Sequence, residues 1–313
     1  MLMKPFESSL MATGLRALVH RLNANHQIHA KMLLELQQME AGDNGEQYLV
    51  KQLQKLAYTM NIHILHNVNL QVPVPIQLDV VIVTPYDVII IECKNIRGNI
   101  QLKMKPRQMI RSLDSGEKNI FNHPEVQLEE YFFGLQEFFK QQQMEVNVSG
   151  VIVFPFNNAS IEHEEGRFPV LMMRELSYFI RQHLQTIQPN DSIPHTKISN
   201  LLIEHHRPYS PFPLCNYYKI NPLILNKGVY CRSCENIKMV RNKRSWICPS
   251  CNKSDKAAHL KALQEYKMLI NHQITNEQAR DFFEVSDRHV VKRLLQNSCG
   301  SIAGHNNKTT YQI

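Results

Sequence analysis

Residues 77–95 constrain the fold more than any other stretch, because they are expected to form one buried β-hairpin. The segment QLDVVIVTPYDVIIIECKN contains two runs rich in Val and Ile, residues 77–84 and 87–93, with Pro85 and Tyr86 between them. Apolar β-branched runs of this length are typical of strands that are buried on both faces. We therefore expect a central sheet that contains this hairpin.

Charged residues interrupt the hairpin at its open end. With the two strands joined by a tight turn, the pairing places Asp79 opposite Glu92. The next pair outward is Gln77 with Lys94, and period-two alternation puts all four side chains on one face of the sheet. Pro85 cannot adopt the positive φ of the common two-residue turns, so a longer turn with a shifted register is the alternative.

Two carboxylates that face each other in a buried strand pair need a compensating cation. Like charges in this position destabilise a sheet, and a buried charge is costly unless it is paired or coordinates a metal. Carboxylate oxygens suit a hard divalent cation such as Mg²⁺ or Mn²⁺. Lys94 would lie beside that cation, where it could stabilise charge on a phosphate. The alternative is a strand end where Asp79, Glu92 and Lys94 reach solvent.

Four motifs in a fixed order carry a resemblance to a known family. They are Gly42-x-x-Gly45-Glu46, Gln77-Leu78-Asp79, Ile91-Glu92-Cys93-Lys94-Asn95 followed by Gly98, and His123-Pro124-Glu125-Val126-Gln127. Together, over about residues 40–155, they resemble the NERD (nuclease-related) domain, which is similar to the PD-(D/E)xK nuclease superfamily. His123 stands where that family usually has Asn, and Cys93 where Val is common, and neither change removes a side-chain ligand.

The resemblance implies a fold and a metal site. The implied fold class is α/β, an α+β mixed sheet flanked by helices with a restriction-endonuclease-like core. Asp79 and Glu92 would bind a catalytic Mg²⁺ or Mn²⁺, with help from the backbone carbonyl of Cys93. The implied activity is metal-dependent phosphodiester hydrolysis, because such a cation polarises a phosphate and lowers the pKa of its bound water.

The resemblance also implies roles for three further residues. Lys94 would orient the attacking water or stabilise the transition state, Glu46 would complete the acidic cluster, and Gln127 would position water or phosphate. The residues alone leave another interpretation of Glu46. If residues 42–45 form a turn, Glu46 opens the next helix and is only a favourable partner of the helix dipole.

The remaining elements of the first two thirds of the chain are predicted from periodicity. We expect helices over residues 6–40 with a break at 23–26, over 126–142 and over 172–185, and strands over 62–70 and 148–155. The scattered histidines are interpreted as ordinary polar residues; they are His163, His183, His195, His205 and His206.

Four of the seven cysteines form two CxxC pairs. The order Cys231-x2-Cys234-x13-Cys248-x2-Cys251 brings four thiolates within tetrahedral reach of one structural Zn²⁺. The intervening loop is slightly shorter than the commonest spacing. An odd cysteine count with this pairing indicates a reducing compartment, so we expect a cytoplasmic protein. A redox dithiol is the alternative.

The loop between the two CxxC pairs is basic. It carries Lys238, Arg241, Lys243 and Arg244, followed by the aromatic Trp246. Such ribbons resemble those appended to topoisomerases and other nucleic-acid proteins, where basic and aromatic side chains bind the strand. We therefore expect these five residues to bind nucleic acid, and a solvated loop on a structural zinc module is the alternative.

Residues 257–297 are predicted to be helical. After a first helix, Thr275 and Ser286 are natural N-caps for two short helices packed across a turn. The arrangement resembles a helix-turn-helix, with Arg288, Lys292 and Arg293 exposed on the second helix to bind nucleic acid. The turn lacks a glycine, so a helical hairpin that binds nothing is the alternative.

Charge and hydropathy narrow the class of protein. The net charge of +7 over 313 residues permits a polyanionic partner, for which we expect nucleic acid and specifically DNA. No run approaches about eighteen apolar residues, so we expect no membrane-spanning helix, and no secretory signal is recognised. The predicted segments are 1–40 (helical), 41–206 (nuclease-like domain), 207–228 (linker), 229–256 (zinc ribbon), 257–297 (helix-turn-helix-like) and 298–313 (polar tail).

Two functions from different classes compete on this sequence. The first is a metal-dependent nuclease in DNA processing, held on its substrate by the zinc ribbon and the helix-turn-helix-like segment. The second is a catalytically inactive DNA-binding or scaffold protein that uses the nuclease fold as a platform. Many nucleases of this fold cut two strands as dimers, which leaves a homodimer open. The two hypotheses are distinguished by one feature of the fold, namely whether Asp79 and Glu92 lie close in space to Lys94 and Glu46.

Overall fold

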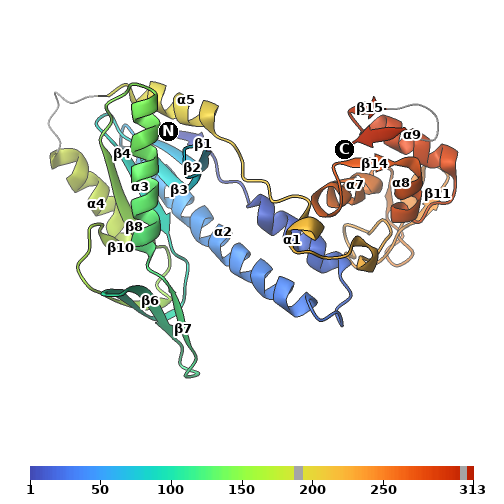
Figure 1. The fold of residues 1–313 in the computed structure, drawn as a ribbon, viewed down its shortest axis with the longest axis horizontal. Helices are drawn as coiled ribbons and strands as arrows, with labels where there is room; N and C mark the ends of the chain where they lie inside the picture. Colours follow the sequence, from blue (N-terminus) through green and yellow to red (C-terminus); the bar gives the residue numbers. More distant parts are fainter. Residues whose placement is uncertain (187–192, 304–308) are drawn as a thin grey trace. The chain divides into compact units, whose positions relative to one another are not determined.

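The computed structural model describes residues 1–186, 193–303 and 309–313 (Figure 1). The chain divides into two compact units. The first consists of Met1–Ser8 and Met39–Tyr209, and the second of Ser9–Gln38 and Ser210–Ile313. The sequence placed residues 1–40 in a segment of their own, whereas here most of that segment belongs with the C-terminal residues, because its apolar side chains pack there.

A six-stranded mixed sheet forms the centre of the first unit. Its order is β1 (Leu2–Lys4), β2 (His63–Leu70), β3 (Ile76–Val83), β4 (Val88–Cys93), β8 (Val148–Phe154) and β10 (Val170–Met172). The pairs β2–β3 and β3–β4 are antiparallel, whereas the pairs β1–β2, β4–β8 and β8–β10 are parallel. The predicted strands over 62–70, 77–84, 87–93 and 148–155 are therefore confirmed.

Helices cover both faces of this sheet (Figure 1). On one face, Leu128 of α3 (Pro124–Gln141) packs in the same core as Ile90. On the other, Leu49 of α2 (His29–Ala57) and Leu176 of α4 (Met173–Thr186) share a core with Ile91. Helix α5 (His195–His205) packs against β2. The predicted fold class, a mixed sheet flanked by helices, is confirmed.

The predicted register of the central hairpin is confirmed over four pairs, from Val83↔Val88 to Val80↔Ile91. The ladder ends there, so the predicted pair of Gln77 with Lys94 does not form. Gln77 pairs with Asn69 of β2 and is exposed. The alternation of faces also breaks at this point, because Leu78 packs in the α3-side core and Val80 in the α2-side core. Asp79 lies at this irregularity.

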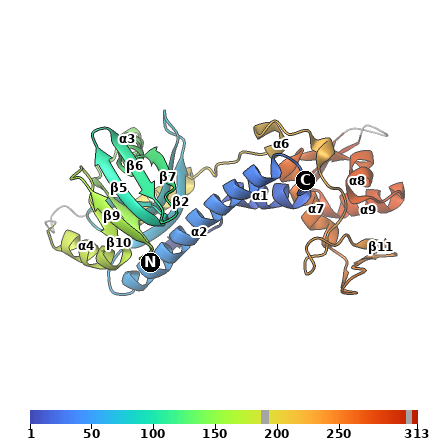
Figure 2. The same cartoon turned by 90° about the horizontal axis from the view of Figure 1, so that it is seen from below.

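A second sheet, missed by the sequence reasoning, lies between β4 and α3 in the chain and includes a strand after β8 (Figure 2). Its order is β7 (Lys118–Asn122), β6 (Arg107–Ser112), β5 (Gly98–Met104) and β9 (Ala159–His163). Its strands are short and half exposed, and they lack the long runs of buried apolar residues that β3 and β4 contain.

Helix α2 corrects the prediction of a turn at residues 42–45. The helix continues through both glycines, so Glu46 lies within it and does not open it. Gly45 serves close packing instead, because a Cβ on it would lie 2.7 Å from Cβ of Asn95. The predicted helical stretch over residues 6–40 is α1 (Leu10–Arg21) followed, after a break, by α2.

In its described residues, the second unit contains four further α-helices, one 3-10 helix, several short strands and two apolar cores. Its elements after α1 are α6 (Leu214–Tyr217), η2 (Pro222–Ile224), β11 (Val240–Asn242), β12 (Ser245–Ile247), β13 (Ser254–Asp255), α7 (Ala258–Leu269), β14 (Gln273–Thr275), α8 (Asn276–Phe283), α9 (Arg288–Ser298), β15 (Ser301–Ala303) and β16 (Thr310–Gln312). Thr275 caps α8 in a reciprocal capping box with Gln278, as the sequence indicated. The N-cap of α9 is Asp287, and not Ser286 as predicted.

Of the polar tail predicted over residues 298–313, the structure describes residues 298–303 and 309–313, and residues 304–308 lie outside the described residues. The described parts include two strands: β16 pairs with β14 on one side and with β15 on the other. Tyr311 is buried in the core of the second unit, which explains the order: one large aromatic side chain holds the strand. Among the described residues, no helix is long and apolar enough to cross a membrane.

Candidate functional site

Three carboxylates from three elements converge at the end of the β3–β4 hairpin. Asp79 comes from β3, Glu92 from the end of β4 and Glu46 from α2. Each raises the pKa of another: Glu46 acts on Asp79, Asp79 on Glu92, and Glu92 on Glu46. The structure therefore brings together the residues that the sequence singled out.

Glu92 is the most enclosed of the three, with a side chain only 1% exposed. The ammonium of Lys94 lies 2.6 Å from its Oε1 and forms an ion pair with it. The other carboxylate oxygen, Oε2, has no hydrogen-bond donor among the described residues. Burial, followed by the charge of Asp79, raises its pKa to about 8, against the opposing effect of Lys94.

Asp79 is held by the backbone of the neighbouring strand. Its Oδ2 accepts a hydrogen bond of 3.0 Å from the N–H of Cys93. Burial and the charge of Glu46 nevertheless raise its pKa to about 7. Burial also raises the pKa of the Cys93 thiol well above its ordinary value, so Cys93 offers its backbone rather than a thiolate.

Glu46 forms a hydrogen bond to a residue that the sequence reasoning missed. Its Oε2 lies 2.8 Å from Nε2 of His66, which is buried on β2. Burial raises the pKa of Glu46 to about 8, with further contributions from Asp43 and Glu92, while burial lowers the pKa of His66 to about 4. The hydrogen bond to His66 fixes the position of the Glu46 carboxyl group beside Asp79 and Glu92.

A chain of polar contacts connects Lys94 to helix α3. Nζ of Lys94 donates to Oε1 of Gln127 at 3.0 Å, and Nε2 of Gln127 donates to the hydroxyl of Tyr131 at 2.8 Å. Burial alone would lower the pKa of Lys94, but Glu92 and Asp79 outweigh it and raise that pKa. Lys94 is therefore a fixed cation, aimed by Gln127. Tyr131 was also missed, although its spacing of four residues from Gln127 on a helix would have pointed to it.

The acidic cluster fits a hard divalent cation. Its ligand atoms are oxygens, and the buried Oε2 of Glu92 lacks the hydrogen bonds that buried carboxylates normally have among the described residues. Asp79, Glu92 and the backbone carbonyl of Cys93 are the groups that would hold such an ion. The site is only partly assembled, because in the described part of the chain only the four cysteines bring three or more side-chain ligand atoms within 4.8 Å of one another.

Those four cysteines cluster in the second unit as a candidate site for one metal ion. The Sγ atoms of Cys231 and Cys251 are 3.8 Å apart, and those of Cys234 and Cys248 are 3.9 Å apart. All four are free thiols, and these distances suit ligands around one Zn²⁺ rather than bonded sulfurs. The cysteine cluster agrees with the predicted zinc ribbon, whose strands β11 and β12 form the hairpin between the two CxxC pairs.

The basic residues of the ribbon have unequal exposure. Lys243 and Arg244 are exposed at the tip of the β11–β12 hairpin. Lys238 is exposed but bridges to Glu284 at 2.7 Å, and the guanidinium of Arg241 lies 5.2 Å from the ring centroid of Trp246. The expectation that Trp246 contacts nucleic acid is corrected, because its ring is 1% exposed and belongs to the core.

Helix α9 presents its basic residues as the sequence predicted. Arg288, Lys292 and Arg293 are all exposed, while Val291 and Leu295 on the same helix are buried. The turn before α9 begins at Glu284, which adopts a left-handed conformation with φ of 56° in place of the glycine usual there. Helix α8 therefore precedes α9 and packs with it, and the outer face of α9 is basic.

Comparison with known proteins identifies one family. Residues 41–155 match the family model of the nuclease-related domain (NERD). The matched range includes Glu46, Asp79, Glu92, Lys94 and Gln127 and ends before the cysteine cluster. No curated protein matches this chain. No solved structure matches it either.

Proposed function

Because residues 41–155 match the nuclease-related domain family, we propose that the chain is a metal-dependent nuclease that hydrolyses phosphodiester bonds in DNA. One observation carries the proposal: the carboxylate of Glu92 is buried beside Asp79 and Lys94, and its Oε2 has no hydrogen-bond donor among the described residues. A carboxylate in that condition is stabilised by a bound cation. Mg²⁺ or Mn²⁺ held there would polarise the scissile phosphate and lower the pKa of a bound water.

The residues around the carboxylates have separate tasks in this reaction. Lys94, aimed by Gln127, places a fixed positive charge beside the position of the phosphate and stabilises the charge that develops there. Gln127, itself fixed by Tyr131, holds the ammonium in one place. Glu46 is held by His66 at the edge of the same cluster, where it accepts a proton or a hydrogen bond from water.

The second unit supplies the DNA-binding part of the proposal. Lys243 and Arg244 project from the ribbon hairpin, and Arg288, Lys292 and Arg293 project from α9. Exposed cations of this kind bind phosphates through charge, which gives affinity without sequence preference. Helix α9 follows a short turn after α8, as a recognition helix does in a helix-turn-helix.

One observation favours the alternative, a DNA-binding platform without catalysis. Lys94 already pairs with Glu92, and the raised pKa values of the three carboxylates let them be partly protonated near neutral pH. The cluster is thus stable without a metal. A protein of this kind would bind DNA through the same surfaces and leave it intact.

The test is cleavage of linear duplex, supercoiled and single-stranded DNA, and of RNA, with Mg²⁺ or Mn²⁺. Wild type is compared with the isosteric variants Asp79→Asn and Glu92→Gln and with Lys94→Met. Glu145→Gln, which alters an exposed carboxylate in the loop after α3, is the matched control. We expect metal-dependent cutting by wild type and the control, and losses of a hundredfold or more in the other three. Equal cutting by all variants overturns the proposal, and binding without cutting establishes the platform.

A further inference from the structure

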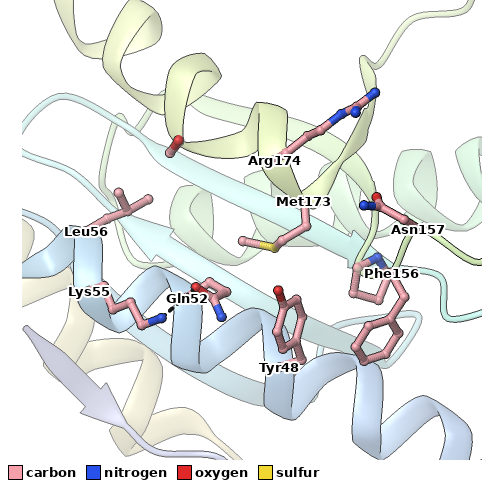
Figure 3. A pocket seen from close by; sticks show the side chains of 10 residues that line it. Tyr48, Gln52, Lys55, Leu56, Phe156, Asn157, Met173 and Arg174 are labelled. Atoms are coloured by element: carbon pink, nitrogen blue, oxygen red, sulfur yellow. Dashed lines mark hydrogen bonds between the residues drawn. The ribbon is translucent and has the colours of Figure 1, made fainter.

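Three neighbouring hollows lie along the outer side of α2 in the first unit. The first is a hollow of about 520 Å³ between α2 and the start of α4, lined by Tyr48, Phe156 and Met173 among others (Figure 3). A second, of about 510 Å³, shares Tyr48 and Phe156, and a third, of about 670 Å³, shares Lys55. We call this continuous surface the α2–α4 track.

The track is positively charged. Its lining residues include Lys51, Lys55, Arg174 and Arg181, and none of the residues that line the three hollows is Asp or Glu. All four cations are exposed, and none forms an ion pair with a carboxylate of the described residues. Their nearest polar contacts are neutral: Lys55 donates to Gln52, and Arg181 to the carbonyl of Ser177. A polyanion would find these charges unneutralised.

Two aromatic rings lie in the middle of this charged surface. The ring centroids of Tyr48 and Phe156 are 4.9 Å apart with an interplanar angle of 31°. Tyr48 is 36% exposed and Phe156 is half-buried, so part of each ring faces the hollow. Figure 3 shows the two side chains next to each other, with Met173 on the α4 side. Aromatic faces between cations are the pattern by which proteins bind unpaired bases and the phosphates beside them.

The track begins beside the acidic cluster. Asn95, the residue after Lys94, lines the second hollow together with Tyr48 and Phe156. Its side-chain amide donates to the carbonyl of Ala41 at 2.7 Å, which ties the end of β4 to α2. A nucleic-acid strand that lies along the track therefore passes next to the end of β4 and to part of α2, the segments that position Lys94 and Glu46.

We propose that the α2–α4 track binds a single-stranded segment of nucleic acid, with one unpaired base stacked on Tyr48 and Phe156 and the flanking phosphates on Lys55 and Arg174. The inference rests on the proposed nuclease function and names its substrate class, nucleic acid with an unpaired stretch next to the cleavage position. Bases in an intact duplex are stacked on each other and offer no free face to these rings. The track therefore discriminates against continuous duplex.

The experiment measures binding of full-length protein to a dye-labelled oligo-dT, an oligo-U and a duplex of equal length, without Mg²⁺ or Mn²⁺ so that nothing is cut. The ring variants are Tyr48→Leu and Phe156→Leu, and the matched control is Tyr58→Leu, which removes an 82% exposed ring just after α2. The charge variants are Lys55→Gln and Arg174→Gln, with Lys140→Gln as control, whose side chain is 81% exposed. Each is repeated with Lys243→Gln and Arg244→Gln present, to remove binding by the ribbon hairpin.

We expect the ring variants to weaken single-strand binding about 5- to 100-fold and to change duplex binding less than twofold, since base stacking on an aromatic ring has this magnitude. A 2-aminopurine base in the oligonucleotide should be quenched by wild type and by Tyr58→Leu, and not by Tyr48→Leu. The oligo-dT and oligo-U arms decide between DNA and RNA. Equal losses for single strand and duplex, or no loss with Tyr48→Leu, overturn the inference.

The two proposals fail in different ways. In the first case, wild type cuts DNA, and Tyr48→Leu binds and cuts single strands as well as wild type does. The proposed binding track is then rejected, and the proposed nuclease function stands. If wild type cuts nothing but its single-strand binding still depends on Tyr48, the nuclease is rejected and the track stands as a binding surface.

Discussion

Lys94 holds its ammonium 2.6 Å from Oε1 of Glu92, a carboxylate whose side chain is 1% exposed. The two residues are separated by one position in the chain, so strand alternation places them on the same face of the sheet. Lys94 thus supplies the only full positive charge that contacts Glu92 in the described part of the chain. The same ammonium therefore serves both the stability of the fold and the proposed chemistry.

Replacing Lys94 by Met should destabilise the metal-free protein. Glu92 stays buried but loses the ammonium that pairs with its Oε1, so we expect a loss of about 1–3 kcal/mol in the free energy of unfolding. Added Mn²⁺ should raise the melting temperature of Lys94→Met more than that of wild type, because a cation then replaces the ammonium. Thermal melts with and without Mn²⁺ measure this, with Lys140→Met as the exposed control. Equal metal responses would contradict it.

The two glycines of α2 should respond in opposite directions to the same substitution. A Cβ on Gly42 meets nothing within 4 Å, so Gly42→Ala should stabilise the helix by about 0.5–1 kcal/mol. A Cβ on Gly45 would lie 2.7 Å from Cβ of Asn95 and 3.2 Å from Pro155, so Gly45→Ala should cost about 1–3 kcal/mol. Cleavage should fall only in Gly45→Ala, since Glu46 moves with it. Urea unfolding and activity of the pair test this, and a stabilising Gly45→Ala would refute the close-packing role.

Zinc should be bound once per chain and should hold the second unit together. Cys231→Ser should lose the metal and unfold the ribbon, because binding energy in a structural zinc site is folding energy, on the order of 10 kcal/mol or more. Cys299→Ser, which alters a half-buried cysteine outside the cluster, should retain the metal. Elemental analysis of purified protein gives the stoichiometry. Full zinc content in Cys231→Ser would rule out this site.

The buried ion pair of Arg21 and Glu265 offers a stability test of the second unit. Nε of Arg21 donates to Oε2 of Glu265 at 2.8 Å, its Nη1 donates to the carbonyl of Asn226, and its guanidinium lies 4.3 Å from the ring centroid of Phe282. Arg21→Met leaves Glu265 buried without its partner, so we expect a loss of about 3–5 kcal/mol. The double variant with Glu265→Leu should recover most of it.

The readout of that test is the fluorescence of Trp246 in urea. Trp246 is the single tryptophan of the chain and lies in the second unit, so it reports that unit by itself. Arg232→Met is the control, because Arg232 is exposed and its bridge to Asp255 spans 3.8 Å, a surface pair worth less than about 1 kcal/mol. A double variant no more stable than the single one would mean that packing, and not charge, sets the cost.

The second unit should lose stability on mild acidification because of His259. Burial, followed by the charge of Arg241, lowers the pKa of His259 to about 4 from an ordinary value near 6.5, against the smaller effect of Asp255. The unfolded chain therefore binds a proton that the folded chain excludes. The contribution to stability is complete above pH 6.5 and is lost as the pH falls toward 4.

His259→Gln should flatten this part of the pH profile. The imidazole stacks near Trp246, with ring centroids 6.4 Å apart, so Trp246 fluorescence in urea at successive pH values follows the same event. The exposed His289 gives the control His289→Gln. A steep loss between pH 6.5 and 4 that persists in His259→Gln would assign it to other groups.

The sequence predicted those features that depend on local pattern. The Val and Ile runs specify β3 and β4 and their register, and the four motifs specify the acidic cluster. Thr275 is the N-cap of α8, as predicted. In each case the physical cause lies within a few residues of the chain.

The rest depends on contacts between distant residues. His66 holds Glu46, although nothing in its own neighbourhood in the sequence distinguishes it from the other histidines. Gly42 and Gly45 resemble a turn, but packing of α2 against Asn95 overrides the local preference. Trp246 follows a basic run, so the sequence predicts that it is exposed. In the structure it is enclosed by the apolar core that the ribbon shares with helices α7 to α9. Burial of this kind is decided by tertiary packing.

The discontinuity of the second unit has a consequence for synthesis on the ribosome. Leu15 and Leu18 of α1 and Met32 of α2 emerge early, but the residues they pack against include Leu214, Leu225 and Leu269. At about 5–20 residues per second, the nascent chain exposes this apolar face for on the order of ten seconds before its partners are made. A chaperone that shields residues 9–38 during that interval would set the yield of folded protein, while the first unit completes its sheet without waiting.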